Sequence, residues 1–216
     1  MNQEQEKIYN KLIFKYNFNK GQKEQIKLGL ENNVDVSIYT KSEYNFMQMK
    51  QIRLGLQKCL DFSLYLSSEF NWMQMTEIRR GLENNLNVSF YSNLKFDCGQ
   101  MKQIRKGLEN SIDVSWYSNP EFNEWKMEQI RLGLENKLDV SWYAKPEFNT
   151  NQMQEIRLGL QHDLDVSIYA NLEFNEIQMQ QIKLGILHNI DVSIYSNPSI
   201  DWLKMKRIRL ELESNE

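Results

Sequence analysis

Apolar residues recur along the chain with the spacing of an α-helix, and the same spacing returns in segment after segment. In residues 123–148, which read NEWKMEQIRLGLENKLDVSWYAKPEF, Met127, Ile130, Leu134 and Leu138 follow one another at intervals of 3, 4 and 4 residues. These intervals place the four side chains on one face of a helix. The first half of the segment is therefore expected to be an amphipathic helix.

Start and stop signals flank this apolar face. Asn123 is a favourable N-cap, and most equivalent segments carry Gln three residues after the cap, which completes a capping box. The helix is expected to run about 13 to 14 residues and to end near Lys137. The second half begins with a cap at Asp139 and has room for about one to two turns before Pro146. Each segment thus predicts a long helix, a short helix and a turn.

The segment is one unit of a tandem repeat. Glycines recur every 26 residues, at Gly29, Gly55, Gly81, Gly107, Gly133, Gly159 and Gly185. Seven units occupy residues 19–200, a capping helix is expected in residues 1–18, and a half-unit follows in residues 201–216. Because a unit this short cannot cover its own apolar face, the units must stack. We therefore predict an all-α fold, an α-solenoid of helix and short-helix repeats.

Both ends of the array read as caps. Lys23 stands where later units have Met, and Glu211 replaces the helical glycine in the half-unit, where it is joined by Glu213 and Glu216. We expect these glutamates to form a polar end cap on a complete short solenoid. Glycine inside a helix costs about 0.5 to 1 kcal/mol relative to alanine. The glycine flank is therefore expected to meet a neighbouring helix or a Tyr ring, and to face the next repeat.

Composition narrows the class of protein. The chain has 26 Lys and Arg against 29 Asp and Glu, a formal charge of -3. This balance disfavours both a uniformly acidic DNA mimic and a strongly basic nucleic-acid binder. The first residues have no apolar signal core, and no apolar run is long enough to cross a bilayer, which predicts a cytoplasmic protein. Cys59 and Cys98 make neither a disulfide framework nor a metal motif.

A cation follows the invariant Ile of every unit. These cations are Lys27, Arg53, Arg79, Arg105, Arg131, Arg157, Lys183 and Arg209. Stacked at the repeat spacing, they form a ladder that could track the phosphates of a nucleic acid. Their long side chains could instead pack beside the apolar face and pair with Glu residues four positions later, as Arg79 could with Glu83. Both interpretations stay open at this point, with pairing favoured.

The sequence gives no sign of catalytic chemistry. One Ser recurs two residues after the second cap of each unit, with no His to activate it, so a local hydrogen-bonding role is expected. His162 and His188 occupy equivalent places in adjacent units and are expected at the surface, too far apart to share a metal ion. We therefore predict a protein that is not an enzyme and that uses no cofactor or metal.

Recognition is expected where the repeat varies. The residue before the helical Gly is usually Leu, but Arg80 and Lys106 stand there in the two middle units, near Lys102. The residue before the invariant Tyr grows to Phe90, Trp116 and Trp142, and Trp125 appears on the long helix. Arg and aromatic residues are enriched at interface centres, so these seven residues are the candidate partner-binding set. The alternative is that the large rings only fill a wider part of the stack.

The consensus QMxxIRxGLExxLDVSxYAxPEF resembles a short tandem repeat of uncharacterised proteins from low-GC Gram-positive bacteria and from their phages and mobile elements. The resemblance covers residues 19–216. In the commoner form a Gly precedes the LDVS segment, whereas here the position holds Asn33, Cys59, Asn85, Ser111, Lys137, Asp163 and Asn189. The resemblance supplies no catalytic residues. It implies a small binder encoded by a mobile element, of the kind that blocks host defences.

We therefore expect a non-enzymatic scaffold whose partner is a protein, such as a host defence nuclease or effector that it would inhibit in the manner of an anti-CRISPR protein. The alternative is a nucleic-acid-binding α-solenoid that uses the cation ladder, with Trp116 and Trp142 as stacking platforms. Self-association through Met47, Met73, Trp125, Ile177 and Leu203 is a further expectation.

Overall fold

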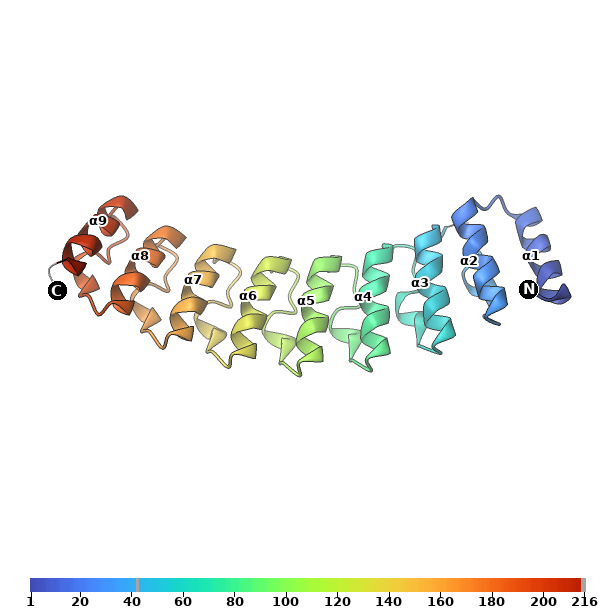
Figure 1. Cartoon of the computed structure of the whole chain (residues 1–216), viewed down its shortest axis with the longest axis horizontal. Helices are drawn as coiled ribbons and strands as arrows, with labels where there is room; N and C mark the ends of the chain where they lie inside the picture. Colours follow the sequence, from blue (N-terminus) through green and yellow to red (C-terminus); the bar gives the residue numbers. More distant parts are fainter. Residues whose placement is uncertain (42, 215–216) are drawn as a thin grey trace. The chain divides into compact units, whose positions relative to one another are not determined.

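The structure, a computed structural model, describes residues 1–41 and 43–214 and is helical throughout (Figure 1). Within these residues it has nine α-helices, seven short 3-10 helices and no strand. The α-helices are α1 (Gln3–Lys15), α2 (Lys20–Glu31), α3 (Phe46–Gln57), α4 (Trp72–Glu83), α5 (Cys98–Glu109), α6 (Glu124–Glu135), α7 (Thr150–Gln161), α8 (Glu176–Leu187) and α9 (Trp202–Glu213). The 3-10 helices are η1 (Val36–Ile38), η2 (Phe62–Tyr65), η3 (Val88–Phe90), η4 (Val114–Trp116), η5 (Val140–Trp142), η6 (Val166–Ile168) and η7 (Val192–Ile194).

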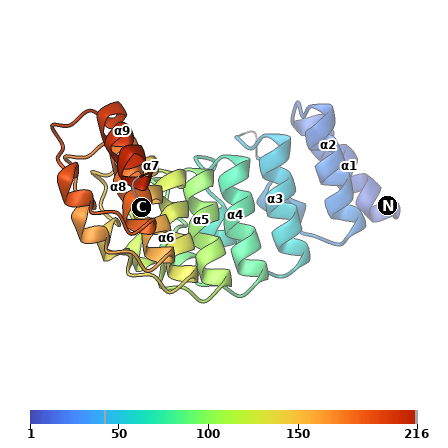
Figure 2. The same ribbon diagram turned by 60° about the vertical axis from the view of Figure 1, so that its left-hand side comes forward.

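The chain forms two compact units, Met1–Glu109 and Asn110–Glu216. In the first, α1 to α5 pack in succession, each against the next; in the second, α6 to α9 do the same (Figures 1 and 2). From α2 onward one short helix lies between each long helix and the next in the chain, and η2 contacts both α3 and α4. This repeated packing confirms the predicted α-solenoid. The boundary between the two units falls inside the repeat that runs from residue 97 to residue 122.

The long helices begin where the sequence places their caps. At the start of α3, Gln48 N donates to Asn45 Oδ1 at 3.0 Å and Asn45 N donates to Gln48 Oε1 at 2.9 Å, which is the predicted capping box. The same Gln has a second role that the sequence did not indicate. Gln48 Nε2 donates to Phe70 O, 22 residues later, at 2.7 Å. The capping residue therefore also joins its 26-residue repeat to the next repeat.

This bridge recurs along the chain. The equivalent amide donates to a carbonyl of the following turn at Gln22, Gln74, Gln152 and Gln178. Where the sequence has Lys126 in place of Gln, Lys126 Nζ donates to Pro146 O at 2.7 Å. A lysine can thus provide the hydrogen bond between neighbouring repeats, although it cannot complete the capping box.

The long helices end one to two residues earlier than predicted. Helix α6 has 12 residues and ends at Glu135, with Asn136 as its C-cap. Lys137 then adopts a left-handed conformation with φ of 58°. The same occurs at Asn33, Cys59, Asn85, Ser111, Asp163 and Asn189, where φ lies between 53° and 59°. The left-handed helix ending that glycine favours is therefore present here without glycine, although left-handed backbone costs a side-chain-bearing residue about 1 to 2 kcal/mol.

Each short helix is a single 3-10 turn held by its cap. Asp139 Oδ1 accepts a hydrogen bond from Ser141 N at 3.1 Å and another from Ser141 Oγ at 2.6 Å. The equivalent pair at Asp165 and Ser167 has the same two bonds, of 3.0 and 2.5 Å. The local role predicted for the recurring Ser is confirmed.

The invariant residues form the core. The Ile and Tyr columns are almost completely buried, as at Ile78 and Tyr91, and Met75 lies with them. The predicted contact between the glycine flank and a Tyr ring is confirmed, but the prediction that this flank faces the next repeat is wrong, because the ring belongs to the glycine's own repeat, ten residues later. A Cβ atom at Gly81 would lie 1.9 Å from Tyr91 Oη and 2.7 Å from Val88 Cγ1. The correction follows from the short helix, which folds back onto the helix that precedes it.

The two ends differ from the repeats. Helix α1 has no buried residue and reaches α2 through the direct link 16–19, and Gln5 Nε2 donates to Leu30 O at 2.6 Å. In the half-unit, Glu213 pairs with Arg209 and with His188, while Glu211 is exposed, 3.7 Å from Arg207. Glu216, the third member of the predicted end cap, lies outside the described residues.

Candidate partner-binding surface

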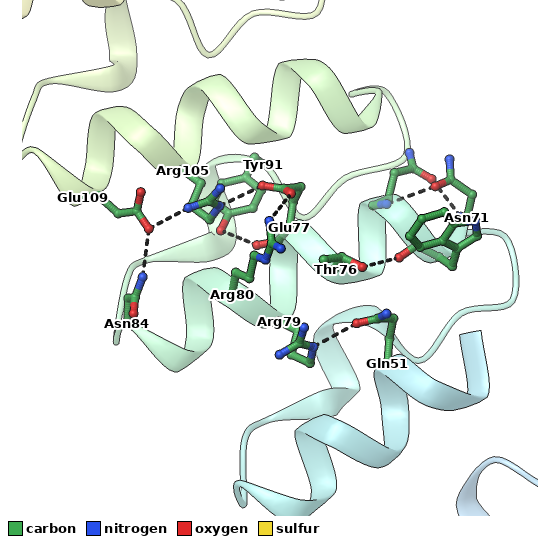
Figure 3. A network of polar contacts seen from close by, with 12 residues as sticks. Gln51, Asn71, Thr76, Glu77, Arg79, Arg80, Asn84, Tyr91, Arg105 and Glu109 are labelled. Carbon is green, nitrogen blue, oxygen red and sulfur yellow. Dashed lines mark hydrogen bonds and ion pairs between the residues drawn. The ribbon is translucent and has the colours of Figure 1, made fainter. Parts of the chain in front are cut away.

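The cations that follow the invariant Ile are held by the 26-residue repeat that precedes them. In Figure 3, Arg79 Nε donates to Gln51 Oε1 at 2.9 Å, and Arg105 Nε donates to Glu77 Oε2 at 2.8 Å. In each pair the acceptor lies 28 residues before the cation, on the neighbouring long helix. The other pairs of this kind are Arg53 with Gln25, Arg157 with Gln129, Lys183 with Glu155 and Arg209 with Gln181. These bonds cross the interface between stacked helices.

The remaining nitrogens of these cations bond within their own helix. Arg105 Nη1 lies 2.6 Å from Glu109 Oε1, and Arg79 pairs in the same way with Glu83. Arg53 uses Gln57, at 2.8 Å. Pairing with a residue four positions later, predicted from the sequence, is therefore confirmed. Since the guanidinium groups are already bonded on two sides and largely buried, they are poorly placed to contact phosphates.

The predicted basic patch lies in the first unit and is partly neutralised. The Arg80 side chain is half exposed, but its Nη1 lies 3.4 Å from Glu77 Oε1, so Glu77 serves both Arg80 and Arg105 (Figure 3). Lys102 is exposed on α5 and Lys106 is half-buried. Phe90, on η3, is exposed.

The predicted tryptophans lie in the second unit and are exposed. Trp116 on η4 and Trp142 on η5 have 43% and 36% of their surface open, and Trp125 near the start of α6 has 58%. The structure thus divides the predicted set, with Arg80, Phe90, Lys102 and Lys106 in one unit and the three tryptophans in the other.

Sequence reasoning missed that the short-helix column stays apolar and exposed beyond the aromatic residues. Ile168 on η6 and Ile194 on η7 have 37% and 56% of their surface open. We call Trp116, Trp142, Ile168 and Ile194 the short-helix ladder. With adjacent helices spaced roughly 10 Å apart, it presents one apolar side chain per step. The sequence signal for this surface is the apolar residue that precedes the invariant Tyr in every 26-residue repeat.

A carboxylate precedes each rung of the short-helix ladder by three residues. These carboxylates are Asp113, Asp139, Asp165 and Asp191, all exposed. Each acid is the N-cap of the 3-10 turn that carries the rung, and its side chain accepts a hydrogen bond from the Ser N–H of that turn. Hydrogen bonds from Ser115 hold the pKa of Asp113 below its usual range, and Ser167 and Ser193 lower the pKa values of Asp165 and Asp191. Asp113, Asp165 and Asp191 are therefore ionised at neutral pH.

Charge also differs between the two units. The first carries 16 Lys and Arg against 12 Asp and Glu, a formal charge of +4; the second carries 10 against 17, a formal charge of -7. The near-neutral total conceals this division, which a count by halves would have found. The short-helix ladder thus belongs to a distinctly acidic body.

Neither a metal site nor a membrane span is found in the part of the chain that the structure describes. No group of three His, Cys, Asp or Glu side chains is arranged to hold a metal ion. None of the described helices has both the length and the apolar character needed to cross a membrane. Comparison of the chain with protein families, curated proteins and solved structures gives no match.

Proposed function

We propose that the chain is a non-enzymatic scaffold that binds a protein partner through the short-helix ladder of its second unit. The observation that carries this proposal is the exposure of one large apolar side chain at the same position in four consecutive short helices. The surrounding columns are used internally: the Ile and Tyr residues fill the core, and the cations bond to neighbouring helices.

Burial of this exposed apolar column by a partner would lower the free energy. Completely burying a large apolar side chain yields about 1.5 to 3 kcal/mol, and half-exposed side chains still retain much of that gain for a partner. Trp116 and Trp142 are of the residue type most enriched among dominant interface contacts. Four rungs, roughly 10 Å apart, are long enough to underlie an interface of standard size.

The acidic column limits the partner to a basic surface. Asp113, Asp139, Asp165 and Asp191 flank the apolar rungs, and the unit that bears them has a formal charge of -7. Opposite charge accelerates association and excludes acidic partners. The partner we propose therefore has Lys and Arg residues interspersed with apolar side chains.

The narrower proposal concerns the partner's identity. A basic, apolar surface is what the nucleic-acid channel of a nuclease presents, and the repeat resembles those of phages and mobile elements in Gram-positive bacteria. An inhibitor of a bacterial defence nuclease or effector, acting in the cytoplasm, joins these two observations. The second candidate, nucleic-acid binding, is disfavoured by the internal pairing of the cation ladder and by the acidic charge of the second unit.

Affinity purification with matched variants tests the proposal. The chain is used as bait in lysates of Gram-positive bacteria, with and without nuclease treatment. Trp116→Ser combined with Trp142→Ser should abolish capture of a specific protein, and nuclease treatment should not. The matched control, Phe14→Ser combined with Leu94→Ser, alters two exposed apolar residues of the first unit and should leave capture intact. Loss of capture in both variants, or only after nuclease treatment, would refute the proposed surface.

A further inference from the structure

A groove lies in the first unit, between α1 and the first repeat. Its volume is about 510 Å³, within the range of natural ligand pockets. Apolar side chains dominate its lining, and these come from α1, the end of α2 and η1: Ile8, Leu12, Leu30, Val34 and Val36. The groove belongs to residues that the short-helix ladder does not use.

The groove follows from a missing short helix. From α3 onward, every long helix of the described chain has a short helix just before it, and η2 contacts both of its long neighbours, α3 and α4. Helix α2 has none, because residues 16–19 connect it directly to α1. The flank of α2 and η1 that would meet a preceding short helix therefore meets only α1, whose side chains do not fill the space.

Three lysines line the groove beside its apolar side chains: Lys11, Lys15 and Lys41. No carboxylate among residues 1–41 and 43–214 lies within ion-pair distance of any of them. The one carboxylate in the lining, Asp35, accepts bonds from Ser37 N at 3.0 Å and Ser37 Oγ at 2.6 Å. The groove thus combines apolar walls with three lysines that form no ion pair among the described residues; Lys15 Nζ lies 4.9 Å from the centre of the Tyr16 ring.

We propose that this groove binds an acidic peptide segment with an apolar anchor, in the place of the missing short helix. The repeat itself shows the chemistry that fits there, since its second half begins with Asp or Asn and continues with an apolar residue and Tyr. An apolar side chain of the peptide enters between α1 and η1, and its carboxylates lie near the three lysines. This site is separate from the short-helix ladder and selects a partner of the opposite charge.

The test uses a peptide with the sequence of residues 113–122, DVSWYSNPEF, blocked at both ends. Titrated into the full chain, it should bind with a dissociation constant on the order of 100 µM, as suits a contact smaller than a standard interface. Binding is measured by calorimetry and located by methyl NMR. Shifts at Leu12, Val34 and Val36 support the site, and shifts confined to α6–α9 would overturn it.

Charge variants separate this site from general attraction between a peptide and a basic unit. Replacing Lys11, Lys15 and Lys41 together by Gln should weaken binding at least tenfold. The control replaces Lys20, Lys50 and Lys95, which are exposed but do not line the groove, and should change binding less than twofold. Equal weakening by the two triple variants, or no saturation of the wild-type chain by 1 mM peptide, would overturn the proposal. Circular dichroism of both triple variants checks that the helices are retained.

Discussion

Arg105 on α5 and Glu77 on α4 form a buried ion pair across the helix interface, with Arg105 Nε 2.8 Å from Glu77 Oε2. One repeat earlier the same geometry joins Arg79 to a neutral partner, Gln51. The interface therefore accepts either a carboxylate or an amide opposite the cation. The hydrogen bond is the shared requirement, and the second charge is not.

The first prediction follows from this pair. Glu77→Gln should change the free energy of unfolding by less than about 1 kcal/mol, because the amide keeps the bond as Gln51 does. Arg105→Ala should cost about 3 kcal/mol, because it leaves a buried carboxylate whose one remaining cation is the half-exposed Arg80, 3.4 Å away. Urea unfolding followed by circular dichroism measures both. A larger loss for Glu77→Gln than for Arg105→Ala would contradict the expectation.

The second prediction concerns the contact between glycine and tyrosine. Gly55→Ala should destabilise the chain by about 1 to 3 kcal/mol, because its Cβ would lie 1.8 Å from Tyr65 Oη. Tyr65→Phe alone should cost little, since the hydroxyl only donates to Gln51 O over 3.5 Å. The double variant should recover most of the loss, because the next ring atom, Cζ, is 3.1 Å away.

A double-mutant cycle in urea unfolding gives the coupling between Gly55 and Tyr65. The control is Gly81→Ala with Tyr91→Phe, in which Val88 Cγ1 still lies 2.7 Å from the new Cβ. Recovery should therefore be smaller at Gly81 than at Gly55. Additive losses at Gly55 would show that the hydroxyl is not what requires glycine there.

The third prediction concerns the left-handed residues. Lys137→Gly should raise the free energy of unfolding by about 0.5 to 1 kcal/mol, because glycine adopts a φ of 58° without steric cost. The neighbouring exposed Asn136 has φ of -91° and bonds to Leu132 O through its side chain. Asn136→Gly should therefore lower stability. Thermal melting of the two variants measures the contrast, and a gain at both positions would refute the assignment.

The fourth prediction is a loss of stability at alkaline pH. Burial raises the pKa of Tyr195 to about 12, and burial also raises the pKa values of Tyr65, Tyr91 and Tyr143. In the unfolded chain these phenols ionise near pH 10. Because the folded pKa lies above the unfolded one, the contribution of the buried tyrosines to the free energy of unfolding is complete below pH 10 and is lost as the pH rises toward 12.

Melting temperature measured from pH 8 to 12 should thus be insensitive to tyrosine ionisation below pH 10 and fall steeply above it. Absorbance of the phenolate at 295 nm should rise for the buried tyrosines only as the chain unfolds. Tyr65→Phe should make the alkaline decline shallower, since it removes one of the protons released on unfolding. A phenolate signal from all tyrosines before unfolding would contradict the burial.

Local structure was predictable because its signals lie close together in the sequence. The cap at Asn45 and its Gln48 are three residues apart, and the spacing of Met127 and Ile130 identifies the buried face without tertiary information. The bond between Arg105 and Glu77 was not predictable, because it depends on the rotation of two stacked helices relative to each other. The direction of the glycine flank failed for a similar reason, since the repeat pattern does not say how far a short helix folds back.

The site was less predictable than the fold. Trp116 and Trp142 are the two largest side chains at the position before the invariant Tyr, whereas Ile168 and Ile194 resemble the smaller residues found there, and only their exposure marks them as rungs of the same surface. The groove beside α1 arises from an element that is absent between residues 16 and 19, and an absence leaves no motif to recognise.

The bond from Gln48 to Phe70 O gives the stack a chemical direction. Helices α2, α3, α4, α7 and α8 each donate a Gln amide to the turn that follows, and α6 donates a Lys ammonium group. Any whole number of 26-residue blocks can be excised or duplicated, and each amide still meets a carbonyl of the same kind. Copy number can therefore drift in evolution at little energetic cost. Each such event changes how many acidic or basic repeats the chain carries, so recombination between repeats offers a direct genetic route to new partners.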